Sequence, residues 1–405
     1  MKKILIALCL TLCAAVSGSA QSARDMEFKQ QCDSINRLVN VAIKNDDNQR
    51  AEQECLQVIK LLESRPEASR KLYSMILTNL YYNLACFQSL QNKKSEAIQS
   101  LELAYRHDYR NYRHMLQDTD LDNLRNEQGF KDILARIREK GDYLYILQKA
   151  PGYRPNQQQT DTLPRFTYAN PSDSNLVRVR RYFRLDSVAG AGDELSKIKN
   201  ILTYIHDKIQ HDGLNENPPT ANAIGLAEAC KDGSRGLNCR GLATILNECY
   251  LSMGFKSRFV TCMPKEYIND CHVINAVYSD SLDKWIWVDP TQNAWVTDEN
   301  GTMLGIHEVR ERLRNGQPLV LNEEANWNNR NRTTAEEYLY DYMAKNLYYV
   351  VCSLRSQYGT EDRAGNSDPV RYVSLMPVGY TNEREKNTLI VNDPDWFWQP
   401  PSTSD

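Results

Sequence analysis

Hydrophobic residues in the first part of the chain recur with the spacing of amphipathic helices. Between residues 25 and 141, apolar positions fall three or four residues apart, and no stretch alternates as a strand would. Cys55 and Leu62 belong to one such apolar stripe. The apolar run at 81–90 is followed by a polar break at 91–94 and then by a second helical stripe. The pattern predicts an all-helical region that includes an antiparallel helix pair.

Small residues in this region indicate how its helices pack. Ala85, Ala97 and Ala104 are spaced like the small residues of a tetratricopeptide repeat, where closely packed helices leave no room for larger side chains. Ala51 could occupy the equivalent crossing of a preceding helix pair, but its distance does not give a regular period. We therefore predict a tetratricopeptide-like helical domain over residues 21–150. Such a domain either binds a protein partner or serves only for packing, and the pattern does not separate these roles.

A change of composition predicts a domain boundary after the helical region. Residues 151–175 are rich in proline, glutamine, threonine and asparagine and lack periodicity, which indicates a linker or an extended arm. We expect a strand at 177–186. Ile198 and Ile205 then lie on one face of an amphipathic helix predicted for residues 194–211. These elements begin a second domain.

The second domain combines a helix with a sheet. Its apolar runs at 256–262, 272–278 and 284–289 predict three antiparallel strands, and the periodicity of residues 243–253 predicts a helix before them. A helix followed by antiparallel strands makes residues 176–325 an α+β domain.

The remaining residues, 326–405, contain no motif of known role, and we expect a C-terminal extension that packs on the second domain. The tyrosine-rich stretch 338–349 is most simply an amphipathic helix with a packed aromatic face. An aromatic cluster, Trp396-Phe397-Trp398, lies in a polar tail. It could be an exposed platform for a substrate. We favour the alternative, a strap that lies in a groove of its own protein.

The N-terminus has the form of a secretory signal peptide. Two lysines precede an apolar stretch at 4–16, and small residues follow up to Ala20. We predict that residues 1–20 are removed. The apolar stretch is shorter than the roughly 20 residues that cross a membrane, so no transmembrane segment is expected after processing. We therefore expect export to the periplasm; lipid attachment at Cys9 or Cys13 is disfavoured because a leucine precedes each.

Composition excludes several classes of function. The formal charge of -3 gives no basic excess for nucleic-acid binding. No Cys-x-x-Cys pair occurs, which removes zinc ribbons and thioredoxin-like sites, and we expect neither metal nor cofactor. Eleven cysteines become nine after processing, so an odd number remains and at least one thiol stays unpaired within the chain. Cys262 and Cys271 flank one loop and could form a disulfide, which the spacing does not decide.

Three residues in this order suggest thiol chemistry. Cys239 stands where a small-residue turn enters the predicted helix, His272 opens an apolar run, and Asp289 closes the next run. An attacking sulfur must be a thiolate. The positive end of a helix favours it, a histidine can hold its proton, and an aspartate can fix the histidine's orientation.

Four segments around these residues resemble the transglutaminase-like superfamily. They are Asn238-Cys239-Arg240-Gly241-Leu242-Ala243, Gly254 to Val260, His272-Val273-Ile274-Asn275 and Trp285 to Thr291. The resemblance covers about residues 194–298 and implies a papain-like fold, in which a nucleophile helix packs on an antiparallel sheet. It also implies that Cys239 is the nucleophile, His272 the general base and acid, and Asp289 the orienting group.

The superfamily includes crosslinking enzymes, peptidases and amidases, and some members have lost activity. This chain lacks the additional domains and acidic calcium-site clusters of animal crosslinking enzymes. We therefore predict an exported cysteine hydrolase that cleaves peptide-type amides of a peptide or protein substrate through a thioester. The alternatives are a glutamine acyltransferase and a non-catalytic scaffold. An oxyanion donor is also required. The backbone of Cys239 could supply one, and His211, Asn217 and Asn222 are side-chain candidates that the sequence does not rank.

Overall fold

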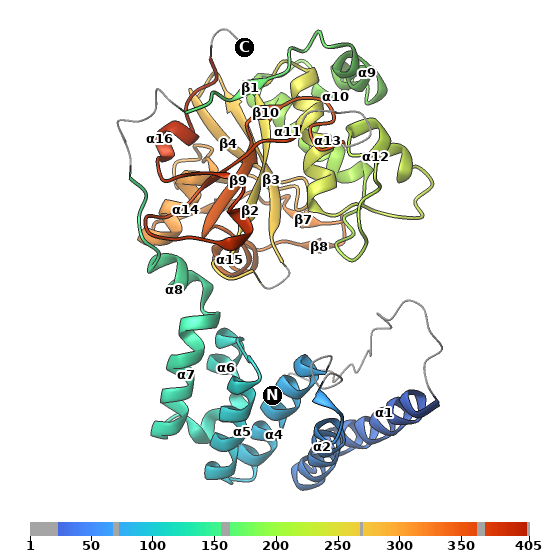
Figure 1. Cartoon of the computed structure of the whole chain (residues 1–405), viewed down its shortest axis with the longest axis vertical. Helices are drawn as coiled ribbons and strands as arrows, with labels where there is room; N and C mark the ends of the chain where they lie inside the picture. The colour runs from blue at the N-terminus through green and yellow to red at the C-terminus, as the bar shows by residue number, and fades with distance from the viewer. Residues whose placement is uncertain (1–22, 68–72, 155–162, 268–269, 363–368, 403–405) are drawn as a thin grey trace. The chain divides into compact units, whose positions relative to one another are not determined.

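The computed structural model of the protein describes residues 23–67, 73–154, 163–267, 270–362 and 369–402. The predicted signal peptide lies outside these residues. The chain divides into two compact units, residues 1–145 and 146–405 (Figure 1). Within the described ranges, no helix has the length and apolar character needed to cross a membrane.

The first unit is helical, as the sequence predicts. Its elements are α1 (Ala23–Lys44), α2 (Asn48–Glu63), α4 (Ser74–Leu90), α5 (Lys94–Arg106), α6 (Tyr112–Gln117), the 3-10 helix η1 (Thr119–Leu124) and α7 (Gln128–Gly141). Helices consecutive in the chain pack against one another, most extensively α4 on α5. Ala85, Ala97 and Ala104 are fully buried there. Their small side chains therefore lie where the helices approach each other, as in a helical repeat.

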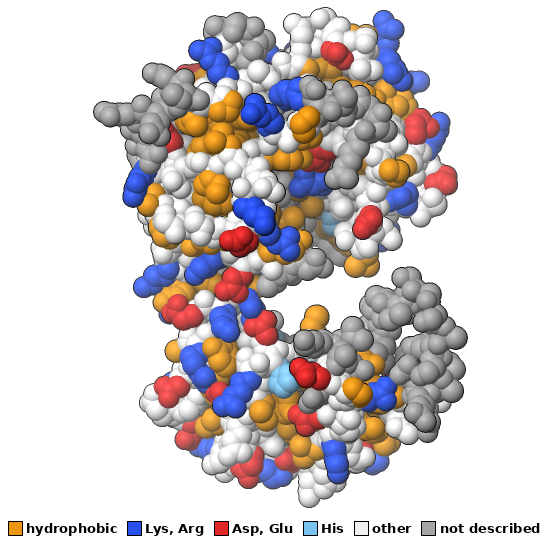
Figure 2. Space-filling model, viewed as in Figure 1, with side chains coloured by type: hydrophobic (Ala, Val, Ile, Leu, Met, Phe, Trp, Pro, Cys, Tyr) orange, Lys and Arg blue, Asp and Glu red, His pale blue; other side chains and the backbone are white. Residues whose placement is uncertain are grey.

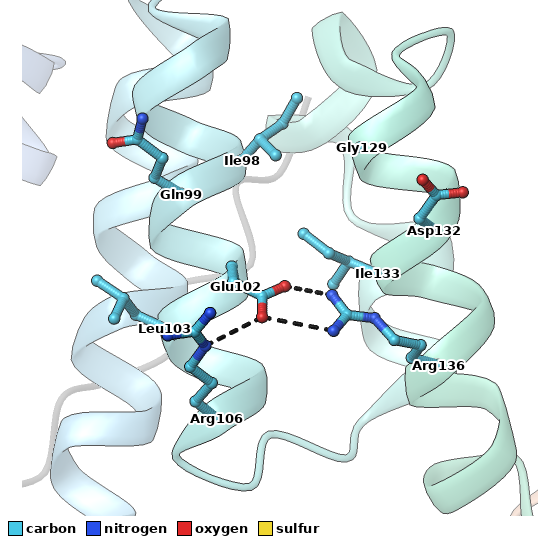
Figure 3. A pocket seen from close by; sticks show the side chains of 9 residues that line it. All are labelled: Ile98, Gln99, Glu102, Leu103, Arg106, Gly129, Asp132, Ile133 and Arg136. Atoms are coloured by element: carbon cyan, nitrogen blue, oxygen red, sulfur yellow. Dashed lines mark hydrogen bonds and ion pairs between the residues drawn. The ribbon is translucent and has the colours of Figure 1, made fainter.

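Helices α5 and α7 also border a groove of ≈ 560 Å³, to which each helix contributes both apolar and charged side chains (Figure 3). Ile98 and Ile133 belong to its apolar lining. Glu102 accepts hydrogen bonds from Arg106 Nε (3.1 Å) and from the Arg136 guanidinium. The pair with Arg136 joins α5 to α7, whereas the pair with Arg106 lies within α5.

The second unit is built around a six-stranded sheet. The strands are β2 (Ser257–Met263), β3 (His272–Ser279), β4 (Lys284–Val288), β9 (Tyr349–Ser353), β11 (Tyr372–Leu375) and β12 (Leu389–Val391). Their order is β12-β11-β9-β2-β3-β4. The three predicted strands are present and antiparallel, with Cys262 opposite His272 and Asn275 opposite Val288. Together with the helical first unit, this confirms the predicted α+β class.

Strands from the end of the chain complete this sheet. β9 runs antiparallel to β2, and β11 and β12 continue the sheet beyond it. The residues after 326 therefore supply half of the sheet, whereas the sequence suggested an extension packed on a finished domain. The tyrosine-rich stretch divides between two structures: residues 336–343 form a π-helix, and Tyr349 begins β9.

Helices cover the sheet on both sides (Figure 1). On one side lie α9 (Ser174–Tyr182), α10 (Leu185–Ala189), α11 (Glu194–Lys208), α12 (Ala223–Ala229) and α13 (Cys239–Ser252). Leu242 and Ile245 of α13 share a buried cluster with Val277, Ile286 and Val288 of the sheet. This packing fixes the position of α13 against β3 and β4.

The strand predicted at 177–186 is wrong, because these residues form α9 and the start of α10. Asp173 caps α9, since its side chain accepts hydrogen bonds from the N–H groups of Asn175 and Leu176. Leu176, Val179 and Phe183 are buried. Their spacing of three and four residues matches a helix face, which outweighs the β-branched residues that favoured a strand.

The remaining elements are short and surround the sheet. They are α8 (Tyr143–Gln148), α14 (Ile306–Asn315), the π-helix η3 (Glu336–Met343), α15 (Ala344–Asn346), η4 (Glu383–Glu385), α16 (Pro394–Phe397) and three small two-stranded pairs: β1 (Thr167–Tyr168) with β10 (Arg355–Ser356), β5 (Val296–Thr297) with β6 (Val320–Leu321), and β7 (Asn326–Trp327) with β8 (Asn331–Arg332). The part of the predicted linker around β1 is an extended arm, since β1 pairs in parallel with β10.

The aromatic tail is a strap that is held by a buried arginine. Arg258 of β2 is only 2% exposed. Its guanidinium lies 4.3 to 5.2 Å from the ring centroids of Phe166, Trp285, Phe397 and Trp398. It also donates a hydrogen bond to the Phe397 carbonyl (2.8 Å). Cation–π contacts and burial therefore join the tail to the sheet and to the extended arm.

Replacing Arg258 with alanine should lower the free energy of unfolding of this unit by about 3 kcal/mol, because it removes these contacts and leaves a cavity. All six tryptophans lie after residue 146, so tryptophan fluorescence during urea unfolding reports this unit alone. Arg258→Met fills most of the volume without the charge, and we expect it to lose about 1 kcal/mol. Equal stability of the alanine variant and the wild type would contradict the anchoring role.

Candidate active site

Cys239 is the first residue of α13, as the sequence predicts for the local structure. Asn238 caps this helix, since its side chain accepts hydrogen bonds from the Arg240 and Gly241 N–H groups. Asn217 holds the cap in turn: its amide donates to Asn238 Oδ1 (2.7 Å), and its oxygen accepts the Asn238 N–H (3.0 Å). The helix start, where the backbone carries partial positive charge, is thereby fixed around the thiol.

Glycine at position 241 allows this arrangement. A Cβ atom there would lie 2.8 Å from Asn217 Nδ2, closer than side chains pack. Asn217 can therefore lie against the first turn of α13 only because residue 241 has no side chain.

His272 and Asp289 meet at the edge of the sheet. His272 begins β3, and Asp289 directly follows β4. The Nε2 atom of His272 lies 2.7 Å from Asp289 Oδ2, and both side chains are buried. Asp289 Oδ1 accepts the Thr291 N–H (2.8 Å), which fixes the carboxylate. Because Nε2 faces Asp289, Nδ1 is the nitrogen of His272 left for the thiol.

The thiol of Cys239 lies in contact with His272, and the pKa values of both groups shift. Burial alone would raise the pKa of Cys239, but hydrogen bonds with His211 and His272, the His272 charge and the Val273 N–H lower it to about 6. Burial alone would lower the pKa of His272, but the Asp289 charge and its hydrogen bond, together with Cys239, raise it to about 10. The favoured state between these values is a thiolate–imidazolium pair.

Asp289 stays ionised beside this pair. Burial would raise its pKa, but the His272 charge and hydrogen bonds from His272, Tyr338 and the Thr291 N–H lower it. The three side chains therefore carry alternating charges from the sulfur to the carboxylate.

His211, one of the three oxyanion candidates, contacts Cys239. The indole N–H of Trp327 donates to His211 Nδ1 (3.1 Å). The Asn328 side chain binds the backbone of His211. Its Oδ1 accepts the His211 N–H (2.7 Å), and its Nδ2 donates to the His211 carbonyl (3.0 Å). An indole only donates, so Nδ1 is an acceptor, and in the neutral ring Nε2 carries the hydrogen.

The other two candidates are engaged in the scaffold. Asn217 caps the nucleophile helix as described above. Asn222 caps α12 by accepting the Gly225 N–H, and its amide donates to Asp362 Oδ2 (2.6 Å). Of the three candidates, His211 is therefore the one that hydrogen-bonds to the Cys239 thiol.

Two tyrosines complete the site. From the sequence, both were expected only to pack in an aromatic helix face. The Tyr338 hydroxyl donates to Asp289 Oδ2 (2.5 Å), and the Tyr342 ring lies edge to face with His272 at 5.3 Å between centroids. Both belong to the π-helix η3, which follows the β7–β8 hairpin. π-Helical turns are frequent at functional sites. The run of tyrosines was the available signal, but nothing in it pointed to Asp289 or His272.

The remaining described cysteines are unpaired thiols in this structure. Cys262 and Cys271 do not form the disulfide that their spacing allowed. Cys230 is also a free thiol, so it does not block Cys239. Burial raises the pKa of Cys271, and the nearby Cys239 raises it further. Among the residues that the structure describes, no group of His, Cys, Asp or Glu side chains is arranged to hold a metal ion.

Comparison with known families agrees with this architecture. Residues 182–290 match the model of the transglutaminase-like superfamily, so the chain contains a domain of this superfamily. The matched range includes α11 to α13 and β2 to β4 and ends just after Asp289. Members of the superfamily generally use a cysteine for acyl transfer or hydrolysis. A search of curated proteins found no match to the chain.

The lowered pKa of Cys239 predicts its reactivity at acidic pH. Iodoacetamide reacts with the thiolate. As the pH is lowered, the rate of Cys239 alkylation should therefore fall to half its maximum only near pH 6, whereas the rate for an ordinary thiol falls to half near pH 8.5. Peptide mapping by mass spectrometry over pH 4–10 would measure this rate. His272→Ala should move the midpoint upward, because it removes the positive partner. A midpoint near pH 8.5 in the wild type would contradict the ion pair.

Proposed function

We propose that this protein is an exported cysteine hydrolase that cleaves peptide-type amide bonds, with Cys239 as nucleophile, His272 as general acid and base, and Asp289 as orienting group. The observation that carries the proposal is the contact of the helix-start thiol with His272, whose far nitrogen lies 2.7 Å from Asp289. The superfamily match supports the reaction class. Export rests on the form of the N-terminal sequence, and the periplasm is the proposed location.

In the first step, the Cys239 thiolate attacks the carbonyl carbon of the amide. The sulfur–carbon bond forms while the π electrons move to the oxygen, which becomes negative. When this intermediate collapses, the carbon–nitrogen bond breaks, and the His272 imidazolium gives its proton to the departing amine. The acyl group remains on Cys239 as a thioester. Asp289 keeps His272 oriented and charged until the proton is transferred.

The negative oxygen needs donors that are already in place. The first N–H groups of a helix have no acceptor within the helix, which makes the Cys239 N–H one donor. His211 supplies the second through its Nε2–H, since Trp327 occupies its Nδ1. His211 already contacts the sulfur that carries the acyl group.

In the second step, water resolves the thioester. His272, now neutral, takes a proton from the water as its oxygen attacks the carbonyl carbon. The sulfur–carbon bond then breaks, the acid leaves, and the thiolate–imidazolium pair is restored. An amine in place of water would give a new amide by the same steps, which is the acyltransferase alternative.

The test is direct detection of the intermediate. The protein is mixed with a peptide panel, quenched in acid after milliseconds to seconds, and analysed by intact mass and peptide mapping. We expect an acyl adduct on Cys239 that hydroxylamine removes. Product analysis with a competing primary amine then separates hydrolysis from transfer, and predominant amide products would replace the hydrolase assignment. Turnover without an adduct, with unchanged turnover after Cys239→Ala, would overturn the thioester mechanism.

A further inference from the structure

A groove of ≈ 270 Å³ borders the candidate active site. It is lined by the β7–β8 hairpin and by the π-helix η3. Neither element belongs to the range that matches the superfamily, which ends at residue 290. The groove is therefore formed by parts of this chain that lie outside the shared domain.

Three aromatic residues of the groove each contact a different side chain of the site. Trp327 donates to His211 (3.1 Å), and Tyr338 donates to Asp289 (2.5 Å). Tyr342 packs its ring against His272. A molecule lying on these rings would therefore be separated from His211, Asp289 and His272 by the aromatic side chains that contact them. This adjacency makes the groove a candidate surface for a substrate.

A charged side chain borders the aromatic walls. Arg332, at the end of β8, lines the groove and is exposed. Within the described part of the chain its guanidinium forms no ion pair. The acidic residue of the groove, Glu337, is instead bound to its own helix start, where Thr334 Oγ1 donates to its carboxylate (2.8 Å). The groove thus offers a cation that forms no ion pair with any residue of the described ranges.

We propose that this groove binds a carboxylate-bearing segment of the peptide substrate, with Arg332 pairing with the carboxylate and the aromatic residues contacting the adjacent chain. A guanidinium presents two parallel N–H donors that match both oxygens of a carboxylate. Aromatic rings contact peptide and aliphatic groups without requiring one sequence. This inference rests on the proposed function and adds the class of substrate: peptides with an acidic group near the cleaved amide.

Figure 2 shows basic and acidic side chains interspersed over the visible face of each unit. The charge of this face alone therefore gives no reason to expect a general preference for acidic peptides. The preference should depend on the one position of the peptide that reaches Arg332. It should also be lost at high salt, because the pair is exposed.

The experiment uses alanine hexapeptides in which one glutamate is moved through the six positions, each matched by its glutamine counterpart. Binding of the labelled peptides to the Cys239→Ala protein is measured by fluorescence anisotropy. We expect the glutamate peptide to bind about fivefold more tightly than its counterpart at one position. Arg332→Gln should remove the difference. Arg330→Gln, which removes another exposed charge from the same hairpin, should keep it.

Binding and reactivity separate the two proposals. No glutamate preference at any position, or a preference that survives Arg332→Gln, would overturn the groove assignment. Cys239 alkylation at pH 6 would in that case still support the nucleophile. Conversely, an Arg332-dependent preference together with an unreactive Cys239 would support the groove as a binding site and reject the hydrolase.

Discussion

Replacing Cys239 with alanine should reduce hydrolysis of any peptide substrate by at least about 10⁴-fold, because the attacking atom is removed. The residual rate would come only from binding and from the oxyanion donors. The alanine side chain fits a partly exposed helix start, so the free energy of unfolding should change by less than about 1 kcal/mol. Turnover with a fluorogenic peptide, and unfolding followed by tryptophan fluorescence, measure the two quantities.

Cys271 provides the matched control for this substitution. It precedes His272 in the chain and is also partly exposed, but its pKa is raised by burial. Cys271→Ala should therefore keep both the turnover and the alkylation of Cys239 at pH 6. Loss of activity in Cys271→Ala with retention in Cys239→Ala would show that Cys239 is not the nucleophile and would reject the proposed site.

Asp289→Asn should lower kcat by about 10³ to 10⁴-fold while the fold is retained. The carboxylate accepts hydrogen bonds from His272, Tyr338 and the Thr291 N–H. An asparagine turns an NH2 group toward at least one of these donors and no longer stabilises the imidazolium. The pKa of His272 should fall, and the pKa of Cys239 should rise as its positive partner is lost. The pH profile of Cys239 alkylation should shift upward by more than one pH unit.

Tyr338→Phe is the control for Asp289→Asn. It removes one hydrogen bond to Asp289 but leaves the negative charge and the bond to His272 in place. We expect a loss of about tenfold in kcat and a small shift of the alkylation profile. Equal losses in the two variants would show that packing around Asp289, and not its charge, supports the reaction.

The sequence was informative wherever local pattern decides structure. Helical periodicity located α4 and α5, and the small residues between them marked the place where the two helices pack. The turn before Cys239 indicated a helix start, and β-branched runs located β2 to β4. These features depend on the few residues next to each position, so they can be recognised without knowing the fold.

The pattern failed where two local signals competed or where distant segments met. Residues 177–186 carry β-branched residues, but their burial against the core selects a helix. Strands β9, β11 and β12 were not predicted as part of the sheet, because strand pairing is set by partners far away in the chain. The free thiols of Cys262 and Cys271 likewise follow from tertiary geometry, which spacing does not specify.

Local sequence patterns were enough to name the three candidate catalytic residues, the elements that carry them and the class of chemistry they suit. The packing of distant segments decided that His211, held by Trp327, interacts with Cys239, and that Tyr338 and Tyr342 contact Asp289 and His272. It also placed Arg332, which has no ion pair among the described residues, in the adjoining groove. Chain order fixes which residues are available, whereas hydrogen bonds between remote segments form only when the sheet and its helices have packed.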